Sequence, residues 1–221
     1  MNYITGKTKT DSMAGQQEKE ILLIESQYFP PINFYKTLIE CEKVRFERME
    51  HYQKVSFRNR CYIAGPNGMI LLSVPLVKGK NQRTVMKDVR ISNLEPWQQL
   101  HWKTLTSAYR RSPWFEYFEP ELELLYEKEF EYLLDWNMAC FEFANRALGF
   151  APVVELTEVF EKDYNNDTAI LDLRDKMVPG QVPENAIQYT QVFGERTGFL
   201  PNLSILDLLF CEGKRGLELL K

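Results

Sequence analysis

The chain has 221 residues, of which 44% are hydrophobic, and its 27 basic and 31 acidic side chains give a formal net charge of −4. A chain of this length buries roughly 70% of the surface that it exposes when unfolded, so a core can form without disulfides or metal. We therefore expect a single domain. The acidic balance argues against a dedicated nucleic-acid binder, whose binding face normally makes the whole domain basic.

The cysteines and the hydropathy of the chain indicate a cytoplasmic protein. Cys41, Cys61, Cys140 and Cys211 lie far apart, and no two of them form a C-x-x-C pair. Such cysteines are typical of reduced thiols in the cytoplasm. The sequence shows neither the apolar segment of a signal peptide nor an apolar stretch of about 18 residues, so we expect no membrane span.

Residues 1–20 are predicted to be a disordered tail, and residues 21–221 a single domain. The tail is polar and charged, with almost no apolar periodicity to offset the entropy of ordering its backbone. The domain then begins with the apolar run 21–24, which is typical of a buried strand.

Polar residues directly follow this first strand. Glu25, Ser26 and Gln27 precede two prolines at 30–31, which lack the donor that a strand ladder needs, so the chain is expected to turn here. Ligands bind at such strand ends in open α/β sheets. Because an amide can both donate and accept hydrogen bonds, we predict that Gln27, with the neighbouring Tyr28, binds substrate.

A helix and a second strand are predicted next. Phe34, Leu38 and Ile39 fall on one helical face, and an apolar strand follows at 44–46. A strand, a helix and a second strand in this order begin a βαβ unit, whose two strands are parallel.

A hairpin follows the βαβ unit. The strand-like segments 61–64 and 69–77 flank the dipeptide Asn67-Gly68, which suits the positive φ of a hairpin turn. The predicted fold class is therefore α/β, with a mixed sheet begun by a βαβ unit, an antiparallel hairpin, and helices packed around it.

The second half of the chain is predicted to be mainly helical. Residues 88–92 alternate like an edge strand, and a helix begins at Pro96 with apolar spacing to residue 108. A second helical region is predicted over 120–148. Two short strands are expected at 151–156 and 168–173.

The last predicted helix contains one unusual residue. It is capped by Asn202 and ended by Gly213, and its apolar residues cover most of its circumference. Asp207 is the single acid in the middle of this helix. Because an unpaired buried carboxylate is unstable, Asp207 must meet a cation or a hydrogen-bond donor, or lie on an exposed stripe.

Charged and titratable groups are most concentrated just before the hairpin. Arginine binds phosphate or carboxylate through its planar fork, and lysine adds a point charge, so an anionic ligand would explain the cluster. The substrate-binding residues predicted here are Lys54, Arg58, Asn59 and Arg60. The alternation over 56–60 fits a strand with Arg58 and Arg60 on one face. An edge strand with ordinary surface arginines is an equally weighted alternative.

Only two histidines are present, and we predict that His51 and His101 are catalytic. His101 is the better placed general base, since its helix also carries Trp97, Leu105 and, two turns on, Tyr109. The alternative is a packing histidine among apolar neighbours. Two histidines in distant segments would need further ligands to bind zinc, so no metal is expected.

The common local signatures of catalysis and cofactor binding are missing from the sequence. It contains no G-x-S-x-G elbow, no G-x-x-x-x-G-K-[ST] loop and no G-x-G-x-x-G. A P-loop NTPase and a typical dinucleotide oxidoreductase are therefore not expected. The sequence leaves the cofactor unknown.

Several short motifs occur together in a recognisable order over roughly residues 21–216. They are Gln27-Tyr28-Phe29-Pro30-Pro31, Arg58-Asn59-Arg60 ahead of Asn67-Gly68, Leu72-Ser73-Val74-Pro75, Trp97 with His101, Ala108-Tyr109, and the closing Asn202-Leu203-Ser204-Ile205-Leu206-Asp207-Leu208-Leu209. In this order and spacing they resemble the WbqC-like family. The family pattern suggests adjacent acids after the second strand, whereas Glu47 and Glu50 are separated here, which argues against a paired-carboxylate mechanism.

The resemblance implies an association with bacterial surface-polysaccharide (O-antigen) gene clusters and suggests the transfer of an amino acid such as glycine. We therefore predict a transferase that joins an amino-acid or acyl group to an activated sugar. Cations would hold the anionic donor, and His51 or His101 would remove a proton from the acceptor amine. The expected partner is an anionic small-molecule substrate such as a nucleotide sugar. Tyr109 and Asp207 are further predicted substrate-binding residues.

The alternative function is a noncatalytic binding or scaffold protein that recognises a phosphorylated sugar or a glycan-assembly enzyme. A homodimer and a monomer are equally expected.

Overall fold

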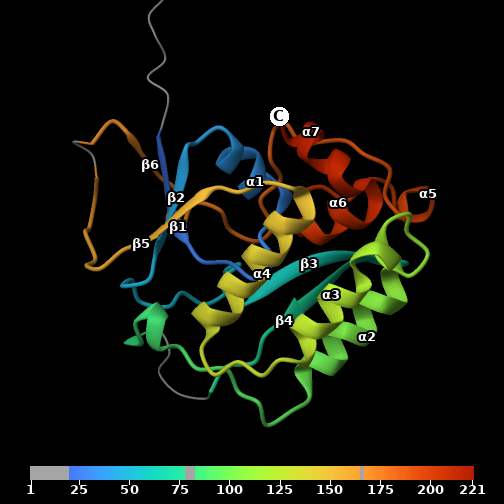
Figure 1. The fold of residues 1–221 in the computed structure, drawn as a ribbon, viewed down its shortest axis with the longest axis horizontal. Coiled ribbons are helices and arrows are strands. Elements are labelled where there is room, and N and C mark those ends of the chain that lie inside the picture. Colours follow the sequence, from blue (N-terminus) through green and yellow to red (C-terminus); the bar gives the residue numbers. More distant parts are fainter. Residues whose placement is uncertain (1–19, 78–82, 165–166) are drawn as a thin grey trace, which may run out of the picture.

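The computed structural model describes residues 20–77, 83–164 and 167–221. The predicted tail lies outside these described residues, apart from Glu20. The described chain forms a parallel sheet, a separate antiparallel hairpin, and helices that pack against both (Figure 1).

The larger sheet consists of four parallel strands. They are β1 (Ile21–Glu25), β2 (Lys43–Glu47), β5 (Val153–Leu156) and β6 (Ile170–Asp172), in the order β5-β2-β1-β6. All five residues of β1 are buried. This confirms the first predicted strand, since a central parallel strand is covered on both faces and reads as a continuous apolar run.

The predicted βαβ unit is confirmed. α1 (Ile32–Ile39) lies between β1 and β2 in the chain, and Ile21 of β1 is paired with Lys43 of β2 in parallel register. Phe34 and Leu38 are buried, as their helical spacing predicts. Phe34 stacks on Phe46 of β2 with 6.3 Å between ring centroids, so α1 covers the face of the sheet that carries Phe46.

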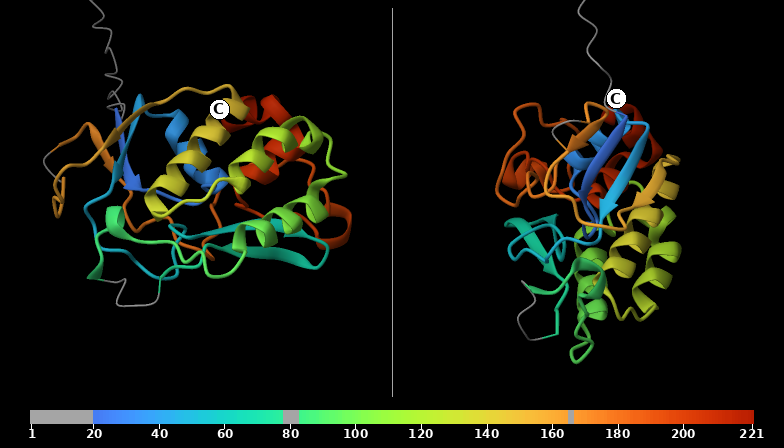
Figure 2. Two further views of the ribbon diagram at one scale, coloured as in Figure 1. Left: turned by 60° about the horizontal axis from the view of Figure 1, so that its bottom comes forward. Right: turned by 90° about the vertical axis from the view of Figure 1, so that its left-hand side faces the viewer.

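The predicted hairpin is also confirmed, but it forms a sheet of its own. β3 (Arg60–Gly65) pairs with β4 (Gly68–Ser73), and Gly68 has a φ of 115°, a value that side chains rarely allow. Figure 2 shows this hairpin apart from the parallel strands and beside the helix that follows it. The second strand ends at Ser73 rather than continuing to residue 77 as predicted.

Three longer helices follow the hairpin. They are α2 (Trp97–Tyr109), α3 (Phe115–Glu127) and α4 (Leu133–Leu148). The prediction of one helical region over 120–148 is wrong in two respects. First, residues 128–132 are not helical, because the chain leaves α3 in an extended conformation at Lys128. Second, α3 begins at Phe115, five residues before Pro120.

The predicted edge strand at 88–92 is mostly incorrect. The chain instead forms the short helix η2 (Met86–Asp88), and only isolated bridges follow, from Arg90 to Tyr132 and from Ile91 to Leu76. Val89 and Ile91 nevertheless point into the core, which explains the alternating pattern without a continuous strand.

The C-terminal segment is helical. It contains α5 (Gly194–Thr197), α6 (Ile205–Glu212), η3 (Gly213–Arg215) and α7 (Gly216–Leu220), and α6 is its most buried part. The cap of α6 is Ser204, whose hydroxyl accepts a hydrogen bond from the backbone nitrogen of Leu206 at 3.3 Å. Asn202, the predicted cap, instead accepts from the backbone nitrogen of Asn33 at 3.0 Å.

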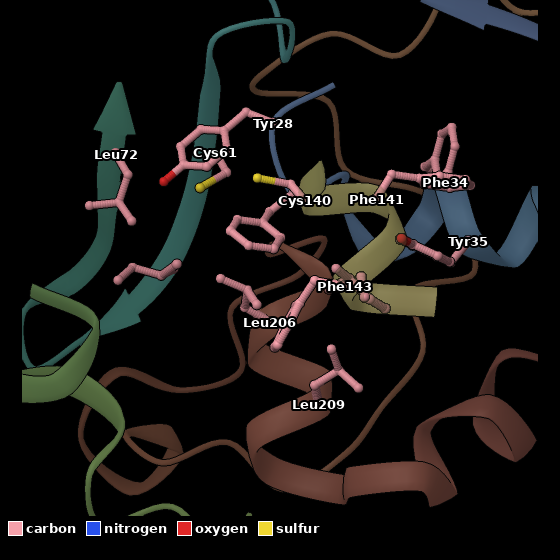
Figure 3. Close-up of a cluster of buried hydrophobic side chains, with 14 of the residues drawn as sticks. Tyr28, Phe34, Tyr35, Cys61, Leu72, Cys140, Phe141, Phe143, Leu206 and Leu209 are labelled. Atoms are coloured by element: carbon pink, nitrogen blue, oxygen red, sulfur yellow. The ribbon is translucent and has the colours of Figure 1, made fainter. Parts of the chain in front are cut away.

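One hydrophobic core joins the two sheets and the helices (Figure 3). Tyr28 lies beside the hairpin with the thiols of Cys61 and Cys140, whereas Phe141 lies on the other side of α4 and packs on Phe34 and Tyr35 of α1. All four cysteines are free and buried, as expected for reduced thiols. Within the described ranges, no helix combines the length and apolar character that crossing a membrane requires.

Candidate functional site

Each of three neighbouring parallel strands ends in an acidic residue. Glu25 is the last residue of β1, Glu47 of β2 and Asp172 of β6. Because parallel strands end at the same edge of a sheet, these carboxylates gather where ligands bind in open α/β sheets. The loops that leave this edge supply the remaining residues of the site.

A buried ion cluster surrounds Arg58 at this edge. The Arg58 guanidinium donates to both carboxylate oxygens of Glu50, from Nε at 2.7 Å and from Nη2 at 2.8 Å. Nη2 also donates to Oδ1 of Asp175 at 2.7 Å and lies 3.7 Å from Oε2 of Glu25. These four residues, which we call the Arg58 cluster, bring together β1, the loops around the hairpin, and the segment after β6.

The Arg58 cluster holds more acids than bases in a largely dry environment. The side chains of Arg58, Glu25 and Glu50 are 1%, 0% and 5% exposed, whereas that of Asp175 is 55% exposed and connects the cluster with solvent. Burial raises the pKa of Glu25, and it raises the pKa of Glu50 to about 7 although Arg58 opposes the shift. Glu50 can therefore exchange a proton near neutral pH.

The backbone at Asp175 is in the left-handed region, with a φ of 56°. Its amide nitrogen donates to Oε2 of Glu25 at 3.0 Å, so the unusual conformation aims both the backbone and the side chain of Asp175 into the cluster. Left-handed non-glycine residues are uncommon and concentrate at functional sites.

Two buried amides border the cluster. Gln27 donates to Oε1 of Glu25 at 3.0 Å, and Asn137 of α4 donates to the backbone oxygen of Arg58 at 2.8 Å. Each amide is 1% exposed. Their carbonyl oxygens accept no hydrogen bond from any residue that the structure describes, so two buried acceptors lie beside the ion cluster.

A second ion cluster lies at the same edge around Arg174. Its guanidinium contacts Oε2 of Glu47 at 3.1 Å and donates to both carboxylate oxygens of Asp172, at 3.0 and 2.7 Å. Glu47 also accepts from the Thr157 hydroxyl at 2.6 Å. Glu47 and Glu50 thus bind different arginines.

Arg58 and Arg60 do not share a strand face, contrary to the predicted alternation. Residues 56–59 form turns, and β3 begins only at Arg60, which is opposite Ser73. Arg58 points into the acidic cluster, whereas Arg60 is partly buried at the start of the hairpin. Acids rather than cations therefore predominate around Arg58.

The other residues predicted near the hairpin lie in two environments. His51 and Lys54 are exposed in the segment after β2. Asn59 is buried, where it accepts from the Tyr52 hydroxyl at 2.9 Å and donates to the Val74 carbonyl at 2.9 Å. Asn59 thus fixes the loop that carries Arg58.

Tyr28 and His101 meet in the aromatic core rather than at the sheet edge. The Tyr28 hydroxyl is 3.0 Å from Nδ1 of His101 and 2.6 Å from the hydroxyl of Tyr126. His101 is 5% exposed, and burial lowers its pKa to about 4. The imidazole is therefore neutral near pH 7.

Tyr109 and Asp207 meet as well, in a third location. Asp207 accepts hydrogen bonds from the hydroxyls of Tyr109 and Tyr189, both at 2.5 Å. These donors meet the requirement that the sequence placed on a buried acid in an apolar helix. Burial raises the pKa of Asp207, with both tyrosines opposing the shift.

The sequence interpretation did not select the acids of the two clusters as site residues. A signal for them exists, because Glu25, Glu47 and Asp172 each end a short apolar segment. Arg174 and Asp175 follow the third of these acids closely, but no local pattern distinguishes them from other loop charges. Among the residues that the structure describes, no group of acids, histidines and cysteines could hold a metal ion.

The fold and this edge define an α/β protein with buried arginine–carboxylate clusters at the carboxyl ends of its parallel strands. The family model of the WbqC-like protein family matches residues 25–182, and the chain belongs to this family. The matched segment begins at Glu25 and extends beyond Asp175, so it contains both clusters. No curated protein and no solved structure matches the chain.

Proposed function

We propose that this protein is a transferase of bacterial surface-polysaccharide (O-antigen) biosynthesis that moves an amino-acid or acyl group onto an activated sugar. The name of its family is consistent with a role in polysaccharide assembly. One structural observation supports a catalytic role: Glu50 is buried beside Arg58, and its pKa is raised to about 7. A general base works best when its pKa lies near the working pH.

In the proposed reaction, the amine of the acceptor sugar attacks the carbonyl carbon of the donor. A carbon–nitrogen bond forms, the bond from the carbonyl carbon to the leaving group breaks, and the leaving group departs with the electron pair. Glu50 takes the proton from the amine. Asp175 is the exposed member of the cluster, so we place the acceptor on its side.

The proposal changes the general base from a histidine to a carboxylate. His101 is enclosed by Trp97 and Tyr28, and its pKa of about 4 makes it a weak base at pH 7. His51 is exposed and remains a predicted catalytic residue. Both histidines are therefore tested together with Glu50.

The experiment incubates the protein with aminoacyl and acyl donors and with nucleotide-linked amino sugars, and detects the product by mass spectrometry. Glu50→Gln keeps the size of the side chain and is expected to lower kcat by about 10²-fold or more. Glu123→Gln, an exposed acid on α3, is the matched control and should retain full activity. His51→Ala or His101→Asn lowering kcat while Glu50→Gln does not would contradict the assignment.

The second candidate function is a noncatalytic protein that recognises a phosphorylated sugar or a glycan-assembly enzyme. The closed state of the Arg58 cluster favours the scaffold form of this candidate over the transferase, because an Arg58 that is bound by both oxygens of Glu50 and by Asp175 forms a structural ion pair. Binding of a sugar phosphate without turnover from any donor in the panel would support this candidate and would contradict the transferase.

A further inference from the structure

A cavity elsewhere in the protein is lined by basic residues, in contrast to the acid-rich Arg58 cluster. This open cavity of about 720 Å³ lies along the second half of α2, and residues 192–193, just before α5, line its other side. Figure 1 shows α5 near the end of α2, although the two are far apart in the sequence. The lining includes Trp102, Lys103, Thr106, Arg110, Arg111 and Phe193.

The cations of this cavity come from one face of a helix and its cap. Lys103 and Arg110 are seven residues apart, which is two helical turns, and Arg111 follows directly. No carboxylate is among the described lining residues, although the chain as a whole has a net charge of −4. The cavity is therefore a local concentration of positive charge in an acidic protein.

These cations are largely unpaired. Arg110 has one distant partner, Glu119, at 3.4 Å. Lys103 and Arg111 form no ion pair with any residue in the described part of the chain. In the Arg58 cluster, by contrast, acids already bind the guanidinium. The cations of the cavity can therefore bind an anion from solution.

The cavity also offers a polar and an apolar contact. The Thr106 hydroxyl is buried and has no hydrogen-bond partner among the described residues. Trp102 and Phe193 supply aromatic surface beside it. The carbonyl end of α2 adds only a partial negative charge, equivalent to about half a unit, which is smaller than three formal positive charges.

We propose that this cavity binds a diphosphate ester whose organic group lies against Trp102 and Phe193. Arginine forks and lysine match the oxygens of a diphosphate, and the free Thr106 hydroxyl can donate to one of them. The organic group can be a nucleoside or a prenyl chain, since both have a face that packs on aromatic rings. The site is separate from Glu50 and does not depend on the reaction proposed there.

Calorimetry with the full chain at low salt tests the proposal. The probes are inorganic pyrophosphate, uridine diphosphate and farnesyl diphosphate. Wild type is expected to bind at least one ester with a Kd below about 1 mM, more tightly than pyrophosphate and less tightly as salt increases. Tighter binding of the nucleotide or of the prenyl ester identifies the organic group. Failure of both esters to bind would overturn the proposal.

Paired variants locate the site. Lys103→Gln with Arg111→Gln is expected to weaken binding of the ester by about tenfold or more. Lys87→Gln with Lys162→Gln removes the same charge from exposed positions that do not line the cavity and should bind like wild type. Equal affinity of the two double variants would contradict the proposed location.

Two single variants complete the design. Thr106→Val keeps the side-chain shape and should weaken ester binding about threefold to tenfold without lowering the melting temperature. Glu50→Gln should bind the ester like wild type, so loss of turnover and loss of diphosphate binding can be distinguished. A Thr106→Val protein with unchanged affinity would contradict the assigned contact.

Discussion

Arg58 binds both carboxylate oxygens of Glu50, at 2.7 and 2.8 Å, in a location where neither side chain is more than 5% exposed. The pair lies at the edge of the parallel sheet where β1 ends, and Asp175 connects it with solvent. Through the contact of Arg58 with Asp175 it joins distant segments of the chain, and it holds a carboxylate whose proton is exchangeable near neutral pH.

Removing the guanidinium should be strongly destabilising. Arg58→Met leaves Glu25 and Glu50 buried without a cation, and we expect the free energy of unfolding to fall by about 3–5 kcal/mol. Urea denaturation measures this change. Arg90→Met is the matched control, because Arg90 forms an exposed pair with Glu131 and its loss should be far smaller. Equal losses for the two variants would show that the cluster does not hold the fold together.

The raised pKa of Glu50 predicts a pH dependence of stability. The folded protein keeps the Glu50 proton up to about pH 7, whereas the unfolded chain releases it near 4.5. Glu50 therefore makes the free energy of unfolding decrease as pH rises from about 4.5 to 7. Glu50→Gln should remove this decrease, which urea denaturation at several pH values measures. A difference between wild type and variant that does not change with pH would contradict the raised pKa.

The lowered pKa of His101 predicts the opposite trend over an overlapping range. The unfolded chain takes up a proton near pH 6.5, whereas the folded imidazole does so only near pH 4. The free energy of unfolding should therefore decrease as pH falls from about 6.5 to 4. His101→Asn keeps an acceptor for the Tyr28 hydroxyl and should abolish this decrease. If the variant stays as acid-sensitive as wild type in the same titration, His101 is not responsible.

The glycine after α6 is required by its neighbours as well as by its backbone. Gly213 has a φ of 59°, and a Cβ added there would lie 2.6 Å from the Trp114 ring. Gly213→Ala should lower the free energy of unfolding by about 3 kcal/mol or more, from overpacking and left-handed strain together.

Gly149 provides the control for this variant. It ends α4 with a φ of 72° and has no atom within 4 Å of an added Cβ. Gly149→Ala should lose only the strain contribution, about 1–2 kcal/mol. Thermal denaturation of both variants separates the two effects, and an equal loss would contradict the role of Trp114.

Local patterns in the sequence predicted the elements whose residues interact with near neighbours. The run 21–24 indicated β1, the helical spacing of Phe34 and Leu38 indicated α1, and Asn67-Gly68 indicated the turn between β3 and β4. These features depend on backbone geometry and on a periodic apolar face, which a short segment carries by itself. Family membership also follows from motifs that are visible in the chain.

Only the tertiary structure decided where the hairpin and the charged residues lie. The hairpin forms its own sheet, and Ser204 rather than Asn202 caps α6. The helical region predicted over 120–148 is interrupted between α3 and α4. The sequence predicted that Arg58 binds an anionic ligand, with an ordinary surface arginine as the alternative, yet Arg58 meets Asp175, which is 117 residues away, in a buried cluster. No local pattern records such a partner, because the energy of a buried charge depends on which distant groups the folded chain brings within a few ångströms of it.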